Sequence, residues 1–181
     1  MRKLHVAEMR RLTVNQFHEA DKLPLVVVLD NVRSLHNVGS VFRTCDAFRV
    51  SRLILCGITS KPPASEIHKT ALGAEDSVEW EYYSDTLQTV ISLREQGYTL
   101  IALEQCEGSI MLDSQSSLSS IPSPIALILG NEVHGVSQDV IDKCQLCLEI
   151  PQSGTKHSLN VSVAAGIAIY HFYSLLSSSL T

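Results

Sequence analysis

The sequence predicts an α/β fold in which a mostly parallel sheet is flanked by helices. Short apolar runs rich in β-forming residues alternate along the chain with segments of helical pattern, and this alternation is typical of a parallel sheet. The 181 residues are 45% hydrophobic, enough for one domain that buries about 70% of its unfolded surface. We therefore predict a short basic arm over residues 1–22, a single domain over residues 23–176 and a frayed tail over residues 177–181.

The elements of this sheet are assigned in order from apolar runs and hydrophobic periodicity. Strands are expected at Leu25–Asp30, Arg52–Cys56, Val78–Tyr82, Thr99–Leu103, Ile125–Leu129 and Leu146–Ile150. Helices are expected at Val38–Phe48, Glu66–Leu72, Thr86–Gln96, Ser137–Lys143 and Asn160–Leu176. The stretch Asp113–Pro124, rich in Ser and Pro, is predicted to be a surface loop because the sheet needs strands on both sides of it.

The last helix is predicted to be buried and to open from a polar loop. Val161 to Tyr170 are almost wholly apolar or small, and a helix that is apolar all round is buried. Ser158 or Asn160 can cap its start. The loop before it places free backbone N–H groups beside side-chain donors, which suits a polar ligand. An ordinary helix cap explains the same residues equally well.

The cysteines indicate reduced thiols and a cytoplasmic protein. The five cysteines are an odd number in a chain with no apolar signal segment. Cys144 and Cys147 have C-x-x-C spacing, but they fall in a strand, and no second pair or His cluster completes four metal ligands. We expect them to be buried structural thiols and expect no metal. The sequence contains no run of about 18 apolar residues, so no membrane span is predicted.

Charge is distributed unevenly. A net charge of −5 argues against a protein that coats nucleic acid indiscriminately. Residues 1–22, however, hold five of the fourteen basic side chains, Arg10 and Arg11 among them, and only three of the nineteen acidic ones. Leu4, Met9, Leu12 and Phe17 can line one side of a helix there. The arm either binds a polyanion or packs on the domain or on a partner subunit.

Three polar, glycine-bearing segments follow predicted strands, at Asn31–Thr44, Gly130–Gly135 and Pro151–Asn160. Ligands of open α/β sheets bind outside the carboxyl ends of strands, so these segments are the expected place for chemistry. No G-x-G-x-x-G opens the first helix, and the glycine spacing around Gly154 is not that of a Walker loop. The alternative hypothesis of an unrelated nucleotide-binding enzyme therefore lacks its main support, a phosphate-binding glycine motif.

Together and in this order, the three segments resemble the motifs of the SpoU-type, TrmH-like branch of the SPOUT RNA methyltransferases. The motifs are Asn37-x-Gly39-x-x-x-Arg43, Leu129-Gly-Asn-Glu132-x-x-Gly135 and Ile150-Pro-x-x-Gly154-x-x-x-Ser158-Leu-Asn160. The resemblance covers about residues 24–173. It implies S-adenosylmethionine as cofactor, a ribose 2′-OH as methyl acceptor, and a deep trefoil knot at the carboxyl end. It also implies a homodimer in which Arg43 of one subunit reaches toward the cofactor pocket of the other.

The resemblance carries catalytic roles to five residues. Arg43 matches the position proposed to ease loss of the hydroxyl proton. Because a guanidinium has a pKa above about 12, we favour Arg43 as a donor that fixes the 2′-oxygen and the adjacent phosphate, with a role as base and a plain surface role as alternatives. Asn37 can cap the first helix or position substrate, and Glu132 can orient Arg43 or the substrate. Ser158 and Asn160 would hydrogen-bond the ribose, the cofactor or Arg43.

The same resemblance predicts the cofactor site and the RNA contacts. Apolar walls for adenine would come from Leu103, Ile150 and Leu159, and its polar edge would be read by groups near Gly130 and Gln152. The full cofactor set is Leu103, Glu104, Gly130, Asn131, Ile150, Gln152, Ser158 and Leu159.

RNA would be held by Arg10, Arg11, Arg33, Arg43 and Lys156. Since only about twenty residues precede the first strand, tRNA is favoured over rRNA. A knotted cofactor- and RNA-binding module without turnover is the rival hypothesis.

Overall fold

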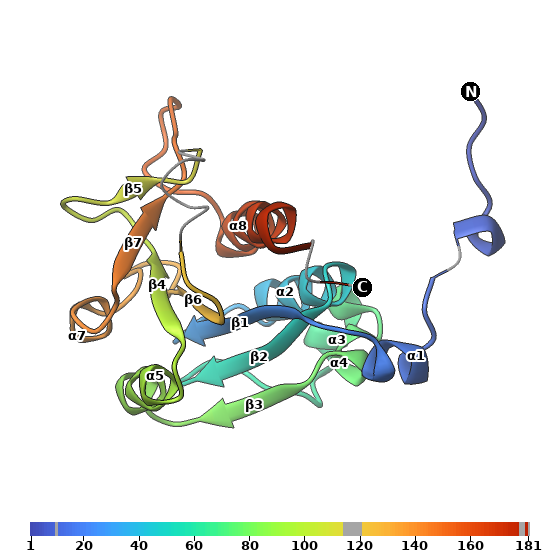
Figure 1. The fold of residues 1–181 in the computed structure, drawn as a ribbon, viewed down its shortest axis with the longest axis horizontal. Helices are drawn as coiled ribbons and strands as arrows, with labels where there is room; N and C mark the ends of the chain where they lie inside the picture. Colours follow the sequence, from blue (N-terminus) through green and yellow to red (C-terminus); the bar gives the residue numbers. More distant parts are fainter. Residues whose placement is uncertain (10, 114–120, 178–179, 181) are drawn as a thin grey trace.

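A computed structural model describes residues 1–9, 11–113, 121–177 and 180 of the chain. It contains a parallel sheet in the order β3-β2-β1-β6-β4-β7-β5 (Figure 1). The strands are β1 (Leu23–Asp30), β2 (Val50–Cys56), β3 (Trp80–Tyr83), β4 (Thr99–Leu103), β5 (Ile110–Met111), β6 (Ile125–Leu129) and β7 (Leu146–Glu149). The order of strands in the sheet therefore differs from their order in the sequence, because β6 lies between β1 and β4 and β7 lies between β4 and β5.

Helices cover both faces of the sheet (Figure 1). The described helices are η1 (Val6–Met9), which lies out on the arm, α1 (Val14–Glu19), α2 (Leu35–Ala47), α3 (Ser65–Ala71), α4 (Ala74–Ser77), α5 (Thr86–Glu95), α7 (Gln138–Ile141) and α8 (Val161–Leu176). One core cluster joins the sheet to α2, α3 and α8, and a second joins its other face to α5 and α7. Val26 and Val28 belong to one cluster and Val27 to the other, because successive side chains of a strand point to opposite faces.

The predicted parallel α/β architecture is confirmed. Each of the six predicted strands is present, with bounds within two residues of those expected, and each of the five predicted helices is present. The two-residue strand β5 and the short helix α4 were not predicted, because elements this short carry too few residues for a period to be read. Part of the predicted loop Asp113–Pro124 and most of the predicted tail lie outside the described residues.

The expectation that Leu4, Met9, Leu12 and Phe17 line one side of a helix in the amino-terminal arm is wrong. The structure has two separate short helices, η1 and α1, and the arm extends away from the body of the molecule (Figure 1). Of the four apolar residues expected on one helix face, Phe17 is buried but Leu4, Met9 and Leu12 are exposed. Lys22 donates to main-chain carbonyls at the end of α1 and so caps a helix rather than extending a free basic surface.

The prediction that all cysteines are reduced is also wrong. Cys106, in the loop after β4, forms a disulfide with Cys147 in β7. The pairing joins residues 41 positions apart, which become neighbours only because β7 pairs with β4. Cys45 and Cys56 are free and buried, and burial raises the pKa of the Cys56 thiol to about 11. Cys144 is free but only partly buried.

The described residues provide neither a metal site nor a membrane-spanning helix. Within the part of the chain that the structure describes, no group of three or more His, Cys, Asp or Glu side chains is placed to hold a metal ion. Likewise, no described helix combines the length and the apolar character needed to cross a membrane.

Candidate functional site

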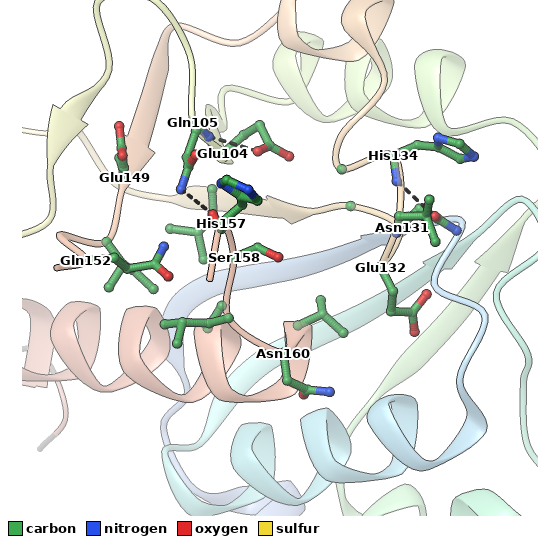
Figure 2. A pocket seen from close by; sticks show the side chains of 18 of the residues that line it. Glu104, Gln105, Asn131, Glu132, His134, Glu149, Gln152, His157, Ser158 and Asn160 are labelled. Carbon is green, nitrogen blue, oxygen red and sulfur yellow. Dashed lines mark hydrogen bonds between the residues drawn. The ribbon is translucent and has the colours of Figure 1, made fainter. Parts of the chain in front are cut away.

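A cavity of about 570 Å³ opens at the carboxyl ends of β4, β6 and β7. Two of the three polar segments, Gly130–Gly135 and Pro151–Asn160, contribute residues to its lining, as expected for an open α/β sheet. The first segment, Asn31–Thr44, contributes none. Figure 2 shows Asn131 and Glu132 on one side of the cavity and Glu149 and Gln152 on the other. The structure brings together every residue predicted to hold a cofactor: Leu103, Glu104, Gly130, Asn131, Ile150, Gln152, Ser158 and Leu159.

The loop after β6 forms a tight, rigid wall of the cavity. Asn131 and Gly135 exchange two main-chain hydrogen bonds of 2.9 and 3.0 Å across it. A Cβ at Gly130 would lie 2.0 Å from the carbonyl carbon of Gly135, so glycine is required for this close approach. The Asn131 amide donates to the main-chain oxygen of Asn31 (2.8 Å), which ties the loop to the end of β1.

Two acidic side chains anchor the far end of the same loop. The buried carboxylate of Asp30 accepts from both the main-chain N–H and the hydroxyl of Ser137 (3.2 Å each) and from the hydroxyl of Thr86 (2.6 Å). The Glu104 carboxylate accepts from the Val136 N–H at 3.0 Å. Glu104 therefore lines the cavity, and its carboxylate is hydrogen-bonded to the backbone of the loop. Such contacts fix the wall before any ligand arrives.

A chain of hydrogen bonds connects the three motifs. The Glu132 carboxylate accepts from the Arg33 and Ser34 main-chain N–H groups (3.0 Å each) and from the Asn37 amide (2.9 Å). The Asn37 carbonyl oxygen in turn accepts from the Asn160 amide at 3.1 Å. Segments that are far apart in the sequence are thereby locked into one arrangement.

These contacts change two of the predicted roles. Glu132 was expected to orient Arg43 or substrate, but its carboxylate is taken by the turn before α2 and by Asn37. Asn37 was a candidate helix cap, but the capping side chain is that of Ser34, which accepts from the Asn37 N–H. Partial burial alone would raise the pKa of the Glu132 carboxyl, yet the N–H groups that it accepts hold that pKa below its usual value.

The third motif leads from the cavity into α8. Asn160 is the N-cap of α8, and its side chain accepts from the Ser162 N–H at 2.9 Å. Ser158 lines the cavity beside it (Figure 2). The prediction that α8 is wholly buried is wrong, because Val163, Ile167 and Tyr170 are 40–58% exposed. These three residues recur at helical spacing, so they form one apolar stripe.

Arg43 lies apart from the cavity of its own chain. It is exposed on α2 and does not line the cavity. Among the described residues, its guanidinium has no hydrogen bond or ion pair. The other predicted RNA contacts Arg11, Arg33 and Lys156 are also exposed, with Arg11 out on the arm. Arg10 lies outside the described residues.

Three side chains at or near the site were not predicted. Gln105 and His157 line the cavity, and the Gln105 side-chain amide donates to the His157 main-chain carbonyl, whereas Asp30 is buried and does not line the cavity. Gln105 lies outside the recognised motifs, so the spacing that revealed the other residues gave no sign of it. Asp30 carried one signal, a charged residue at the end of an otherwise apolar strand.

The cavity suits a ligand with both apolar and polar parts. Its volume falls within the roughly 300–1,000 Å³ typical of small-molecule sites. Leu103, Ile150 and Leu159 supply apolar surface, while Ser158 and Gln152 supply hydrogen-bonding groups. An adenosine-like ligand with a polar amino-acid tail matches this lining, because its base needs flat apolar walls and its remaining parts need donors and acceptors.

Comparisons with known proteins agree with this geometry. The 23S rRNA (guanosine-2′-O-)-methyltransferase RlmB of Nitrosomonas europaea is 32% identical over 93% of this chain. A Staphylococcus haemolyticus protein assigned to the TrmH family of tRNA/rRNA methyltransferases is 32% identical over 88% of it. The chain spans 64% of the length of each of these relatives.

Solved structures share the fold. The A. aeolicus TrmH/SpoU tRNA modifying enzyme superposes with a TM-score of 0.78 and 26% identity, over 97% of this chain and 86% of that one. An AdoMet-bound rRNA methyltransferase from Sinorhizobium meliloti gives a TM-score of 0.76 and 26% identity, over 87% of this chain and 61% of that one. The model of the SpoU rRNA Methylase family matches residues 24–170, and the chain therefore belongs to that family.

Proposed function

We propose that this protein transfers a methyl group from S-adenosylmethionine to a ribose 2′-OH of a structured RNA. The observation that carries the proposal is the hydrogen-bonded chain from Glu132 through Asn37 to Asn160, which joins the three motifs beside a cavity of cofactor size. Family membership supplies the reaction class. A relative that methylates guanosine 2′-oxygens of rRNA supports the ribose as acceptor.

S-adenosylmethionine fits the lining of the cavity. Members of the family are solved with this cofactor bound. When bound, it supplies an activated methyl group on a sulfonium. Leu103, Ile150 and Leu159 would pack on the adenine, and the main-chain groups at Gly130 and Gln152 would read its polar edge.

The protein then has to orient the acceptor hydroxyl in line with the methyl group and let its proton leave. Arg43 is the cation proposed for this role. Because a guanidinium stays protonated up to about pH 12, Arg43 acts as a donor to the 2′-oxygen and the neighbouring phosphate, and the proton passes to phosphate or water. Ser158 and Asn160, at the cavity edge, would hold the ribose.

We propose that the active form is a homodimer with composite sites. Arg43 does not line its own cavity, so a second subunit is needed to complete the site. The apolar stripe of Val163, Ile167 and Tyr170 on α8 is exposed, and α8 packs beside α2, which carries Arg43. Burying this stripe against a second copy would stabilise the dimer through loss of apolar surface and bring Arg43 near the partner's cavity.

The carboxyl-terminal segment is further proposed to be a deep trefoil knot. The stretch after β4 lies alongside β7, where β5 pairs with β7 and the Leu112 N–H donates to the Glu149 carbonyl (2.8 Å). α8 then returns to pack on α2 and β1, on the other side of β4. A chain that crosses its own earlier loop in this way supports a knot, although true knots are rare.

The preferred substrate is tRNA. The likeness to the A. aeolicus tRNA modifying enzyme extends over nearly the whole of this chain and most of that one. The exposed cations Arg33 and Lys156, on loops beside the cavity, are available to phosphates, and Arg11 extends on the arm. An rRNA substrate is the second candidate, because the RlmB relative acts on 23S rRNA.

The deciding experiment incubates the protein with labelled S-adenosylmethionine and with separate pools of unmodified tRNA and rRNA. Nuclease digestion and mass spectrometry then identify the methylated nucleoside. A 2′-O-methylated nucleoside from the tRNA pool supports the proposal, and one from rRNA keeps the reaction but changes the substrate. A methylated base would overturn the mechanism. Cofactor binding without transfer to either pool would favour a binding module, and binding of ATP rather than S-adenosylhomocysteine would favour an unrelated nucleotide enzyme.

A further inference from the structure

The two loops that face each other across the cavity are held very differently. The loop after β6 is fixed by its own glycines and by Asp30, Glu104 and Asn131. The opposite wall, residues 151–159, is exposed throughout. Within the described part of the chain, one hydrogen bond reaches these residues, from the Gln105 side-chain Nε2 to the His157 carbonyl oxygen at 2.9 Å. Figure 2 shows Gln105 reaching across to His157 from the stretch after β4.

The backbone of Gln105 is itself well anchored. Its main-chain N–H donates to the Glu104 carboxylate at 2.8 Å. The next residue, Cys106, is joined by a disulfide to Cys147 in β7. A side chain that extends from a fixed backbone can hold a loop in place, whereas one on a mobile segment would move with it. The contact therefore joins the loop of residues 151–159 to a segment after β4 that is itself linked to β7.

We propose that Gln105 is a positioning residue that holds the loop of the third motif in the arrangement that binds the cofactor, and this inference rests on the proposed function. His157 immediately precedes Ser158 and Leu159, both of which line the cavity. When the His157 carbonyl is held, the positions of these two neighbours are set before the ligand arrives. Without the contact, part of the binding free energy is used to order the loop.

The test replaces the donor without changing the shape of the side chain. Gln105→Glu is nearly isosteric but places a carboxylate oxygen against the His157 carbonyl, and Gln105→Lys restores an N–H donor. Gln96→Glu is the matched control, because the Gln96 amide also donates one side-chain hydrogen bond, to Ser92, and lies outside the cavity lining. Calorimetric titration with S-adenosylhomocysteine is expected to give a Kd about fivefold higher for Gln105→Glu, as for one lost hydrogen bond. Gln105→Lys should recover most of the affinity, and Gln96→Glu should match the wild type.

A second readout needs no cofactor. Trypsin can cut after Lys156, in the middle of the loop, and cleavage there reports how often the loop opens. Gln105→Glu should be cut about fivefold faster than the wild type and than Gln96→Glu. Equal cleavage rates, or equal Kd values in a wild type that binds S-adenosylhomocysteine, would overturn the inference. A wild type that binds no S-adenosylhomocysteine but shows the cleavage difference would overturn the proposed function and leave the loop contact established.

Discussion

The Asn160 side-chain amide donates to the Asn37 carbonyl oxygen across 3.1 Å, although 123 positions separate the two residues in the sequence. Asn37 is nearly buried, and its own amide donates to Glu132. An amide can serve as donor and acceptor at once, so Asn37 links the start of α8 to the loop after β6. A carboxylate at this position could accept but not donate, and an alkyl group could do neither.

Asn160→Asp should break this link while it keeps the helix cap. A carboxylate oxygen can still accept from the Ser162 N–H, as the Asn160 oxygen does now, but it has no N–H for Asn37. We expect a loss of about 1–2 kcal/mol in the free energy of unfolding, the cost of an unsatisfied buried acceptor, together with slower methyl transfer. Urea denaturation measures the first effect. Asn15→Asp, on the exposed face of α1, is the control, and equal stability of the two variants would refute the link.

The hydrogen bonds of Glu132 should make the free energy of unfolding depend on pH in the acid range. Its carboxyl has a folded-state pKa below the ordinary 4.5, so its contribution is complete above that value and is lost as the pH falls through the lower folded value. Glu132→Gln should therefore be less stable than the wild type at about pH 7, and the gap should narrow as the pH falls below 4.5. Urea midpoints measured at about pH 7 and at a series of pH values below 4.5 test this. A gap that stays constant would mean that the charge of Glu132 is not what stabilises the turn.

Gly39 should tolerate no side chain. A Cβ there would lie 2.1 Å from the Thr70 hydroxyl and 2.3 Å from the Ile67 carbonyl oxygen, so α2 and α3 would have to separate. Gly39→Ala is expected to cost about 2–3 kcal/mol by overpacking, which outweighs the roughly 1 kcal/mol that alanine gains inside a helix. Thermal denaturation tests this against Ser40→Ala, the next residue of α2, which should differ little from the wild type. Gly39→Ala with unchanged stability would mean that the helices have room to move.

The sequence was informative where chemistry follows from local pattern. Apolar runs revealed the strands, and the motif spacing identified residues of the cavity such as Gly130 and Ile150. It failed where a residue acts through a distant neighbour. The contact of Gln105 with His157, the disulfide of Cys106 and the hold of Glu132 on the turn before α2 all depend on the order in which strands pair. No periodicity in one segment reports such pairings.

The exposed stripe on α8 predicts the oligomeric state. A charge at its centre, Ile167→Glu, would have to be desolvated on association, which is costly without a partner. We expect this variant to be monomeric in light scattering at concentrations where the wild type is dimeric, with methyl transfer lost and the fold kept. Ile58→Glu is the control, because Ile58 is exposed on the loop after β2. A wild type that is monomeric, or an Ile167→Glu protein that is dimeric, would exclude α8 as the interface.

Arg43 provides the sharpest test of a shared active site. Arg43→Ala should lower methyl transfer at least a hundredfold, as when a donor to the reacting oxygen is removed, and leave cofactor affinity within a fewfold. Arg94→Ala, exposed on α5, should transfer methyl groups at the wild-type rate.

A second experiment mixes Arg43→Ala with Ile150→Trp. Ile150→Trp should also be inactive, because the larger side chain projects from the wall and fills part of the cavity. After subunit exchange, equal mixing of the two inactive variants should restore about a quarter of wild-type activity if Arg43 serves the partner's cavity, since half of the dimers then hold one complete site. No recovery despite exchange would place Arg43 in its own subunit's site, and a fully active Arg43→Ala protein would remove it from the mechanism.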